Sequence, residues 1–506
     1  MIMRMSLGGS HVVRDIIMLW RRWKSDRKAT PFINRLYIYS IIFDPFMFFV
    51  IIDRLTAGFS LTLSRLFLVA FYAMLLAGSL RLKKRPNEPS FDVYLKLACI
   101  FFAYAALAGA FAVLLDYSFI QRAAATDSDT STRLAQVLSY PATRVGIEHF
   151  TLAFTLFHYF FIGPRMILSV EHYRFLTSSF LLLCLCSLFL GLLSFGSAAI
   201  FGQNLLPRHF VEYFYAEPSF SGVRFQGLAG EPRDAVGQLA SFGVALMFLR
   251  RFGVVDSLSG SYRWLLLLAV IAALLTLSAS GIVGFAIFML MFSVFQLFGA
   301  RIDARRFIYF LLLTVSGAAV LVFGVERVER LALYTENFSN IVEQVNEGAQ
   351  FSPIVMAQLN NFYPLIFWSN SCMEHDVGVC LFGGGFGSSF ALNSHVYTEG
   401  LNNAHSYVSR LLPELGLVGF GLFLFLMIWP LFSAIRIHSR RLVDVSGQSV
   451  HFLKIGILLS LATVLAHKSN NFYILAVIVI MGLRFADPAR VPELSAKRLA
   501  APRKVD

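Results

Sequence analysis

Polar residues able to do chemistry gather in the segment NNAHSYVSRLLPELGLVGF, just ahead of an apolar run. His405 follows Asn402 and Asn403 and precedes Tyr407, and a predicted membrane helix begins about ten residues later. A histidine titrates near neutral pH, so at a membrane surface it can serve as a general base. The amide and phenol groups beside it are suited to position a hydroxylated acceptor.

A second candidate site lies in SGVRFQGLAGEPRDAVGQLASFG, residues 221–243. Arg224 and Arg233 bracket a glycine-rich turn, and a Glu-Pro pair precedes a predicted helix. Two guanidinium groups beside a helix N-terminus favour phosphate oxygens, because the forked donors and the helix dipole both attract an anion. The alternative is that these arginines pair with Glu231 and Asp234 or with lipid head groups.

Two carboxylates are alternative bases. Glu231 and Glu414 each stand beside a predicted helix start on the same predicted face as His405. If His405 only positions the substrate, these two residues are the next candidates for proton transfer.

Cysteine usage gives a further hypothesis. Cys372 and Cys380 flank the segment MEHDVGV. An oxidising compartment favours a disulfide that closes this short loop. A Cys/His/Cys metal site is the alternative, but its spacing is unusual and no fourth ligand is evident.

The elements that must position these residues are predicted from composition. The chain has 506 residues, of which 57% are hydrophobic and only 14% are charged. Many apolar runs have the length of about 20 residues that crosses a bilayer. The predicted fold is therefore an all-α polytopic membrane protein. About twelve helices are expected, over 36–53, 62–80, 97–115, 146–164, 177–200, 236–249, 264–279, 281–300, 307–325, 415–435, 452–466 and 471–486.

Lysine and arginine in the short loops predict the orientation of these helices. With the N-terminus inside, the predicted cytoplasmic segments hold 31 of the 43 basic residues. The net charge of +13 then reflects topology and anionic lipid contact rather than nucleic-acid binding. The predicted organisation is a cytoplasmic segment 1–35, helices 1–9 over 36–325 with outer loops 116–145 and 201–235, a large outer loop 326–414, helices 10–12 over 415–486, and a cytoplasmic tail 487–506.

Three ordered segments carry a resemblance to a known family. They are VRFQGLAGEPRDAVGQL, CLFGGGFGSSF and NNAHSYVSRLLPELGLVGFGLFLF. A glycine-rich turn, then His-x-Tyr, then a Glu-Leu-Gly helix start resembles the O-antigen ligase and O-antigen polymerase superfamily. The layout of about twelve helices with a long outer loop before the tenth is similar too.

The resemblance implies a function. Members of that superfamily move a glycan from a polyprenyl-diphosphate carrier to an acceptor, at the periplasmic face of the bacterial inner membrane. By this resemblance Arg224 would bind the diphosphate and His405 would activate the acceptor hydroxyl, with no metal and no other cofactor. Expected partners are the lipid-linked glycan donor, a glycan or lipid-linked acceptor, membrane lipids and a chain-length regulator protein, with no nucleic acid.

This chain departs from the family pattern at one position. Many members have an arginine in a Ser-Arg dipeptide where the seventh helix turns into the eighth, but here the turn reads LSASGIVG, with Gly281 near that place. Arg327 or Arg330 is the candidate replacement.

Three functions remain open from the sequence. The segment GEPRDAVG resembles the polymerase branch of the superfamily, and this resemblance implies a polymerase of lipid-linked repeats, of O-antigen or exopolysaccharide. The first alternative is a ligase that transfers the finished glycan to the lipid A core. The second is a transporter of lipid-linked glycans, a class that places ionisable residues near the bilayer midplane.

Overall fold

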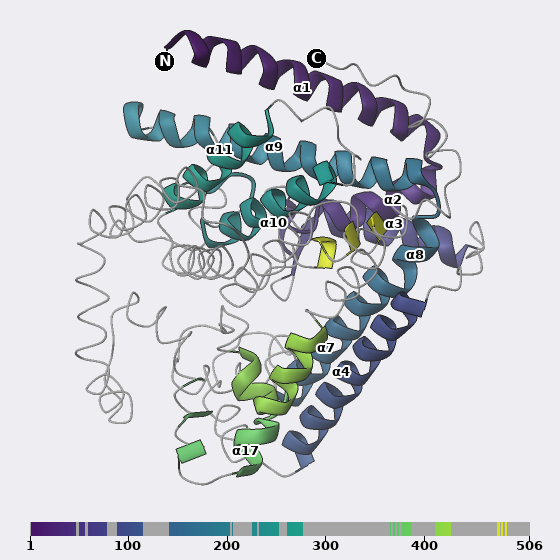
Figure 1. The fold of residues 1–506 in the computed structure, drawn as a ribbon. Coiled ribbons are helices and arrows are strands. Elements are labelled where there is room, and N and C mark those ends of the chain that lie inside the picture. The colour runs from purple at the N-terminus through teal and green to yellow at the C-terminus, as the bar shows by residue number, and fades with distance from the viewer. Residues whose placement is uncertain are drawn as a thin grey trace, which may run out of the picture.

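The computed structural model describes part of the 506-residue chain, and that part is mostly helical (Figure 1). The described residues are 2–46, 50–55, 59–77, 89–114, 141–202, 205, 225–229, 232–251, 261–276, 365, 368–369, 372–373, 377–386, 410–426, 473–475, 477–478 and 481–482.

Helices follow one another along most of the described chain. In order, the elements are α1 (Ile2–Ala29), α2 (Phe32–Ile42), β1 (Val50–Leu55), β2 (Phe59–Thr62), α3 (Leu63–Leu76), α4 (Pro89–Leu114), α7 (Pro141–Leu156), the π-helix η1 (Phe157–Ile162), α8 (Gly163–Met166), α9 (Val170–Phe201), α10 (Pro232–Arg251), α11 (Tyr262–Leu275) and α17 (Val377–Phe382). Residues 410–426 form a further helix, named here the 410–426 helix.

These elements form two groups in space (Figure 1). In the first, α1 lies along α9, with α10, α11, α2 and α3 nearby. In the second, α4 and α7 run side by side away from that group, and α17 lies near their far end. The second group contains the glycine-rich segment and the 410–426 helix, which the sequence analysis links to function.

Helices occupy most of the predicted ranges that the structure describes. The ranges 62–80, 97–115, 146–164, 177–200, 236–249 and 264–279 overlap α3, α4, the α7–η1–α8 run, α9, α10 and α11 respectively, and all of these except α3 begin before the predicted range. The predicted helices over 281–300, 307–325 and 452–466 lie outside the described residues.

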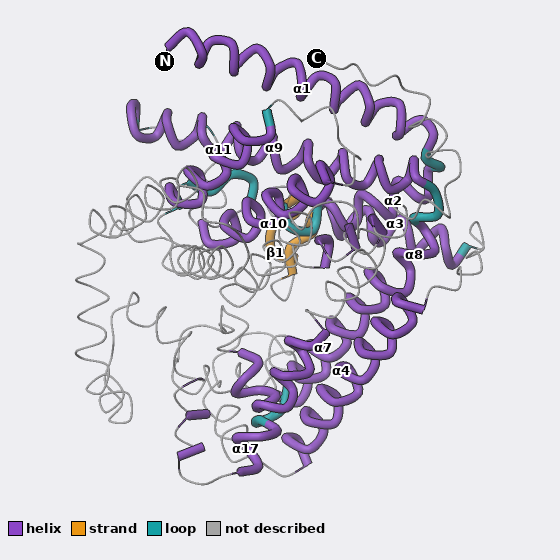
Figure 2. Tube along the Cα trace, in the orientation of Figure 1, coloured by secondary structure: helices purple, strands orange, loops and turns teal. Residues whose placement is uncertain are grey.

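The helix predicted over 36–53 is wrong in its second half. α2 ends at Ile42, and Val50–Leu55 is instead strand β1, paired antiparallel with β2 in a two-stranded ribbon (Figure 2). Its register pairs Val50 with Thr62 and Leu55 with Phe59. Pro45 gives the reason, because proline lacks an N–H donor and disfavours helical geometry in the residue before it.

One of the described helices, α9, has the length and composition to cross a membrane. It spans 32 residues, and its most apolar window has a mean hydropathy of 2.3. About 20 apolar residues suffice to cross the hydrocarbon core. Shorter apolar helices run over Phe32–Ile42, Leu63–Leu76, Leu95–Ala110 and Trp264–Leu275.

A buried histidine joins α2 and α3 to η1. The two ring nitrogens of His158 lie 2.9 Å from Ser40 Oγ and 3.1 Å from Tyr72 Oη. Ser40 donates its own proton to the Tyr37 carbonyl at 2.7 Å, so Nε2–H of His158 donates to Ser40 and Nδ1 accepts from Tyr72. The Tyr37 hydroxyl in turn donates to the His158 carbonyl at 3.1 Å. The network therefore holds a neutral imidazole and ends on main-chain carbonyls.

Helix α1 turns its acidic side chains inward. Asp15 accepts hydrogen bonds from the Ser261 N–H at 3.1 Å and hydroxyl at 2.8 Å, at the start of α11. Trp23 donates to Ser179 of α9 at 2.8 Å. Asp26 is also buried, and its Oδ2 has no hydrogen-bond partner among the described residues.

Asp26 makes the stability of the folded protein depend on pH. Burial raises the pKa of its carboxyl group, while Arg22 and Arg174 partly oppose that shift and Glu171 adds to it. The folded protein therefore binds the proton more tightly than the unfolded chain, and stability falls as pH rises from the unfolded pKa through the raised folded pKa.

We expect Asp26→Asn to raise the thermal midpoint of the detergent-solubilised protein at pH 7. The neutral amide removes the buried charge, so the gain should shrink as the pH is lowered to 4 and Asp26 takes up its proton. Thermal unfolding of both proteins at the two pH values measures this difference. An equal gain at both pH values would show that charge burial is not the cause.

Candidate functional site

Most of the sequence-predicted site residues lie outside the described residues. This holds for Arg224, Glu231, Arg327, Arg330, Asn402, Asn403, His405 and Tyr407. Arg233 lies in the first turn of α10, where only the backbone is described. The structure describes Glu414, Cys372 and Cys380, together with the elements that flank the other candidates.

The glycine-rich segment packs directly on the start of the 410–426 helix. Gly384 N–H donates to the Pro413 carbonyl at 2.7 Å, and Gly383 N–H donates to the Val379 carbonyl at 2.9 Å, which closes α17. Gly383 and Gly385 have φ of 76° and 97°, in the region that favours glycine. Two of the three segments that carry the family resemblance are therefore in backbone contact.

This contact requires glycine on both sides. A Cβ on Gly383 would lie within 3.0 Å of the Glu414 and Leu415 backbone. On the other side, a Cβ on Gly416, where φ is 63°, would lie within 3.0 Å of the Leu381 backbone. Side chains at these positions would force the two backbones apart.

Glu414 is held by a buried ion pair within its own helix. Arg410 Nε lies 3.2 Å from Glu414 Oε2 and 3.3 Å from Oε1, and the two residues are 5% and 0% exposed. The spacing of four residues places the two side chains on one face of the helix. Glu414 is thus shielded from water and held by Arg410.

Aromatic contacts extend the site to α7. The Arg410 guanidinium lies 5.1 Å from the ring centre of Phe386, the residue that ends the described glycine-rich segment. The ring of His149 meets the same phenylalanine edge-on at 5.0 Å. His149 Nε2 donates to the Ala105 carbonyl at 2.6 Å, because a carbonyl only accepts.

Helix α4 supports the same junction. The Tyr104 hydroxyl donates to the Leu415 carbonyl at 2.8 Å, next to the break in helical geometry at Gly416. A Cβ on Gly419 would lie within 3.0 Å of the Tyr104 ring, so this helix approaches α4 closely. We name one assembly the glycine junction. It consists of residues 383–386, residues 410–416 of the 410–426 helix, Tyr104 and His149.

The turn that follows Arg224 is fixed by a separate set of buried contacts. Phe225 N–H donates to the Leu275 carbonyl at 3.0 Å, at the end of α11. Leu228 N–H donates to Ser187 Oγ at 2.8 Å, and Ser187 donates to the Gln238 side chain at 3.1 Å. Gly227 has φ of 59°, and a Cβ there would lie within 3.0 Å of Ser187 Oγ. The chain beside Arg224 is therefore anchored to α9, α10 and α11.

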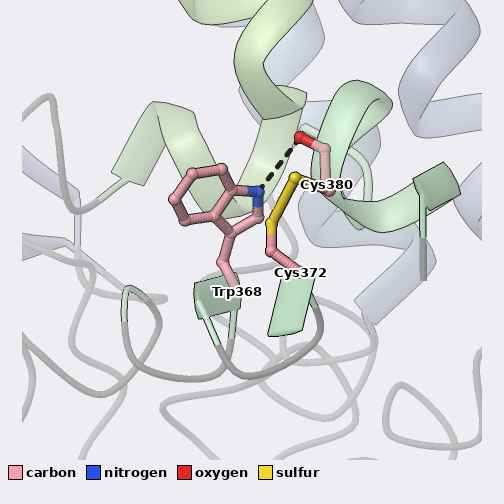
Figure 3. The surroundings of a disulfide bond; sticks show 3 residues. All are labelled: Trp368, Cys372 and Cys380. Carbon is pink, nitrogen blue, oxygen red and sulfur yellow. Dashed lines mark hydrogen bonds between the residues drawn. A yellow bond between two sulfur atoms is a disulfide. The ribbon is translucent and has the colours of Figure 1, made fainter. Parts of the chain in front are cut away.

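Cys372 and Cys380 form a disulfide, one of the two alternatives raised by their spacing (Figure 3). Their Cα atoms lie 4.9 Å apart, and Cys380 is eight positions after Cys372 in the chain. The indole of Trp368 donates to the Cys380 carbonyl at 3.3 Å. The disulfide thus closes a loop that leads directly into the glycine junction.

The glycine junction contains three residues that were not among the predicted site residues, namely Arg410, Tyr104 and His149. The spacing of Arg410 and Glu414 was a usable signal, because residues four apart on a helix are neighbours. Tyr104 stands 311 residues before its partner Leu415, and no local pattern marks that contact.

Comparison with known proteins adds no assignment. The sequence matches no protein-family model and no curated protein.

The close approach of the two backbones predicts the effect of adding one methyl group. Gly383→Ala should destabilise the protein by about 2–4 kcal/mol, because the new Cβ overlaps backbone and the positive φ is strained. Gly421→Ala is the matched control, since a Cβ there has no neighbour within 4 Å, and it should be neutral or stabilising. Thermal unfolding of both variants tests the difference, and equal midpoints would contradict the contact.

The buried ion pair predicts a non-additive result. Glu414→Gln should cost about 3–5 kcal/mol, because it leaves the Arg410 charge buried and poorly compensated. Replacing both residues, as Arg410→Met with Glu414→Leu, should recover most of that loss. Thermal unfolding of the single and double variants measures the coupling. If the double variant is no more stable than Glu414→Gln, the pair does not act as a unit.

Proposed function

We propose that this chain is an integral membrane glycosyltransferase of the bacterial inner membrane. It polymerises polyprenyl-diphosphate-linked oligosaccharide repeats at the periplasmic face. The observation that carries the proposal is the glycine junction. In it, the backbones of two segments that carry the resemblance, CLFGGGFGSSF and NNAHSYVSRLLPELGLVGFGLFLF, are in contact. The apolar helix α9 supports the membrane location.

The reaction needs two groups at opposite ends of one bond. The acceptor hydroxyl attacks the anomeric carbon of the donor, and the bond from that carbon to the diphosphate oxygen breaks. A base takes the hydroxyl proton, and cations stabilise the charge on the departing polyprenyl diphosphate. His405 is the proposed base, and Arg224 is the proposed diphosphate ligand, with Arg233 close by in sequence.

The anchored turn supports the role of Arg224. Phe225, its neighbour, is bonded to the last residue of α11, a few residues before the turn where this chain has Gly281 instead of the family arginine. The anchored turn supports Arg224 as the proposed diphosphate ligand, and Arg327 or Arg330 stays the proposed replacement for the missing arginine.

A ligase that transfers the glycan to the lipid A core uses the same chemistry with another acceptor. Deletion of the gene in its host separates the two. Loss of a polymerase leaves single repeats attached to the core, whereas loss of a ligase leaves carrier-linked chains and bare core. A glycan ladder resolved on a gel reports which pattern occurs, and an unchanged ladder would contradict both functions.

We expect His405 to be the most sensitive of the histidines predicted to face outward. A positioned base contributes about 10²–10⁴-fold, so His405→Ala should lower the transfer rate at least about 10²-fold, or about 2.7 kcal/mol. His209→Ala and His395→Ala are the controls and should retain most activity. The measurement is transfer by purified protein with a lipid-linked donor.

A second substitution separates the two roles of His405. His405→Gln keeps a hydrogen-bonding group but cannot accept the proton near neutral pH. If this variant turns over at a near-normal rate, His405 positions the substrate and the base lies elsewhere. Transfer in detergent, without a second compartment, would also exclude transport as the sole activity.

A further inference from the structure

The disulfide lies on the element that presents the glycine junction. Cys380 is in α17, and Gly383 follows that helix directly. The sulfur of Cys380 is joined to Cys372, and its carbonyl accepts the hydrogen bond from Trp368 (Figure 3). Cys380 is therefore held both through its side chain and through its main-chain carbonyl, three residues before the buried Gly383.

α17 is short and leaves much of its apolar surface exposed. It is only six residues long, and an isolated helix of that length is unstable in water. Its apolar side chains contribute little burial, since Val377 is 62% exposed and Phe382 is 53% exposed, while Val379 is buried. The residues after it, 383–386, are all buried. The partly exposed helix α17 is thus followed directly by the buried residues 383–386.

The position of α17 determines the position of that loop. Gly383 N–H is bonded to Val379 within α17, and Gly384 N–H is bonded to Pro413. Gly416 packs on the backbone of Leu381, which also belongs to α17. If α17 unfolds, Gly383 loses its hydrogen bond to Val379, and Gly416 loses its packing against Leu381.

We propose that oxidation of Cys372 and Cys380 is a maturation step that sets the glycine junction, and that this segment folds in an oxidising compartment. Each thiol loses one proton and one electron as the S–S bond forms. The electrons pass by thiol–disulfide exchange to the disulfide of an oxidoreductase in that compartment, which leaves as a dithiol. The partner is therefore a protein thiol oxidase. The consequence for glycan transfer rests on the proposed function.

The number of reactive thiols tests the modification itself. The chain has five cysteines, and Cys99, Cys184 and Cys186 are free. Full-length protein denatured directly from membranes with a maleimide polymer should gain three labels, and five after reduction. A host that lacks its thiol oxidase should give five labels without reduction. Five labels from the normal host would overturn the proposal.

Hydrogen exchange tests the effect on the junction. In Cys372→Ser/Cys380→Ser, the amides of the 380–390 peptide should exchange roughly 10- to 100-fold faster, because the closed loop no longer restrains α17. Cys186→Ser is the matched control, since that cysteine is exposed and unpaired, and it should exchange at the wild-type rate. Mild reduction of the folded wild-type protein provides a second route that does not depend on folding of the variant.

These readouts do not depend on catalysis. Unchanged exchange in both the double variant and the reduced wild type would overturn the proposal, even if the protein transfers glycan normally. Faster exchange, together with the expected thiol counts, supports it even if the wild type transfers no glycan. In that case the proposed function fails and the maturation step stands.

Discussion

Two stretches of backbone approach more closely at the glycine junction than any residue with a side chain would permit. Gly383 faces the backbone of Glu414 and Leu415, and Gly416 faces that of Leu381. This steric constraint decides the geometry around it. It brings the Gly384 amide to the Pro413 carbonyl, and it turns the Leu415 carbonyl away from its own helix toward Tyr104. The ion pair, the aromatic contacts and the disulfide all surround this one approach.

Different forces fix the two sides of the junction. On the helix side, Arg410 and Glu414 form a buried pair, and such pairs often contribute little net stability because desolvation offsets their attraction. Loss of one partner alone is costly, because it leaves the other charge buried and uncompensated. On the loop side, a disulfide that closes a loop of eight residues is worth about 2.5 kcal/mol in the chain-entropy account. The loop therefore depends more on its covalent closure than the helix depends on its charges.

Sequence reasoning predicted the helical class and the ranges of most described helices, because long apolar runs give a strong local signal. It missed the end of α2, although Pro45 was a visible breaker, because the apolar residues continue on both sides of it. It identified Gly383–Gly385 and Glu414 as parts of one motif. It did not identify Tyr104 or His149, since contacts between distant segments depend on packing that no local pattern encodes. The spacing of four residues between Arg410 and Glu414 could have identified Arg410 as the partner of Glu414.

Two buried polar clusters bear differently on function. At His158, the imidazole bonds to the hydroxyl groups of Ser40 and Tyr72, and the hydroxyl groups of Ser40 and Tyr37 bond to carbonyls of α2 and η1. Hydrogen-bonded clusters of this kind fix the packing of the helices that they join. The glycine junction instead assembles polar groups from α4, α7 and the 410–426 helix next to the segment that contains His405. The convergence of polar groups from three helices at one junction is the feature that supports the proposed transferase.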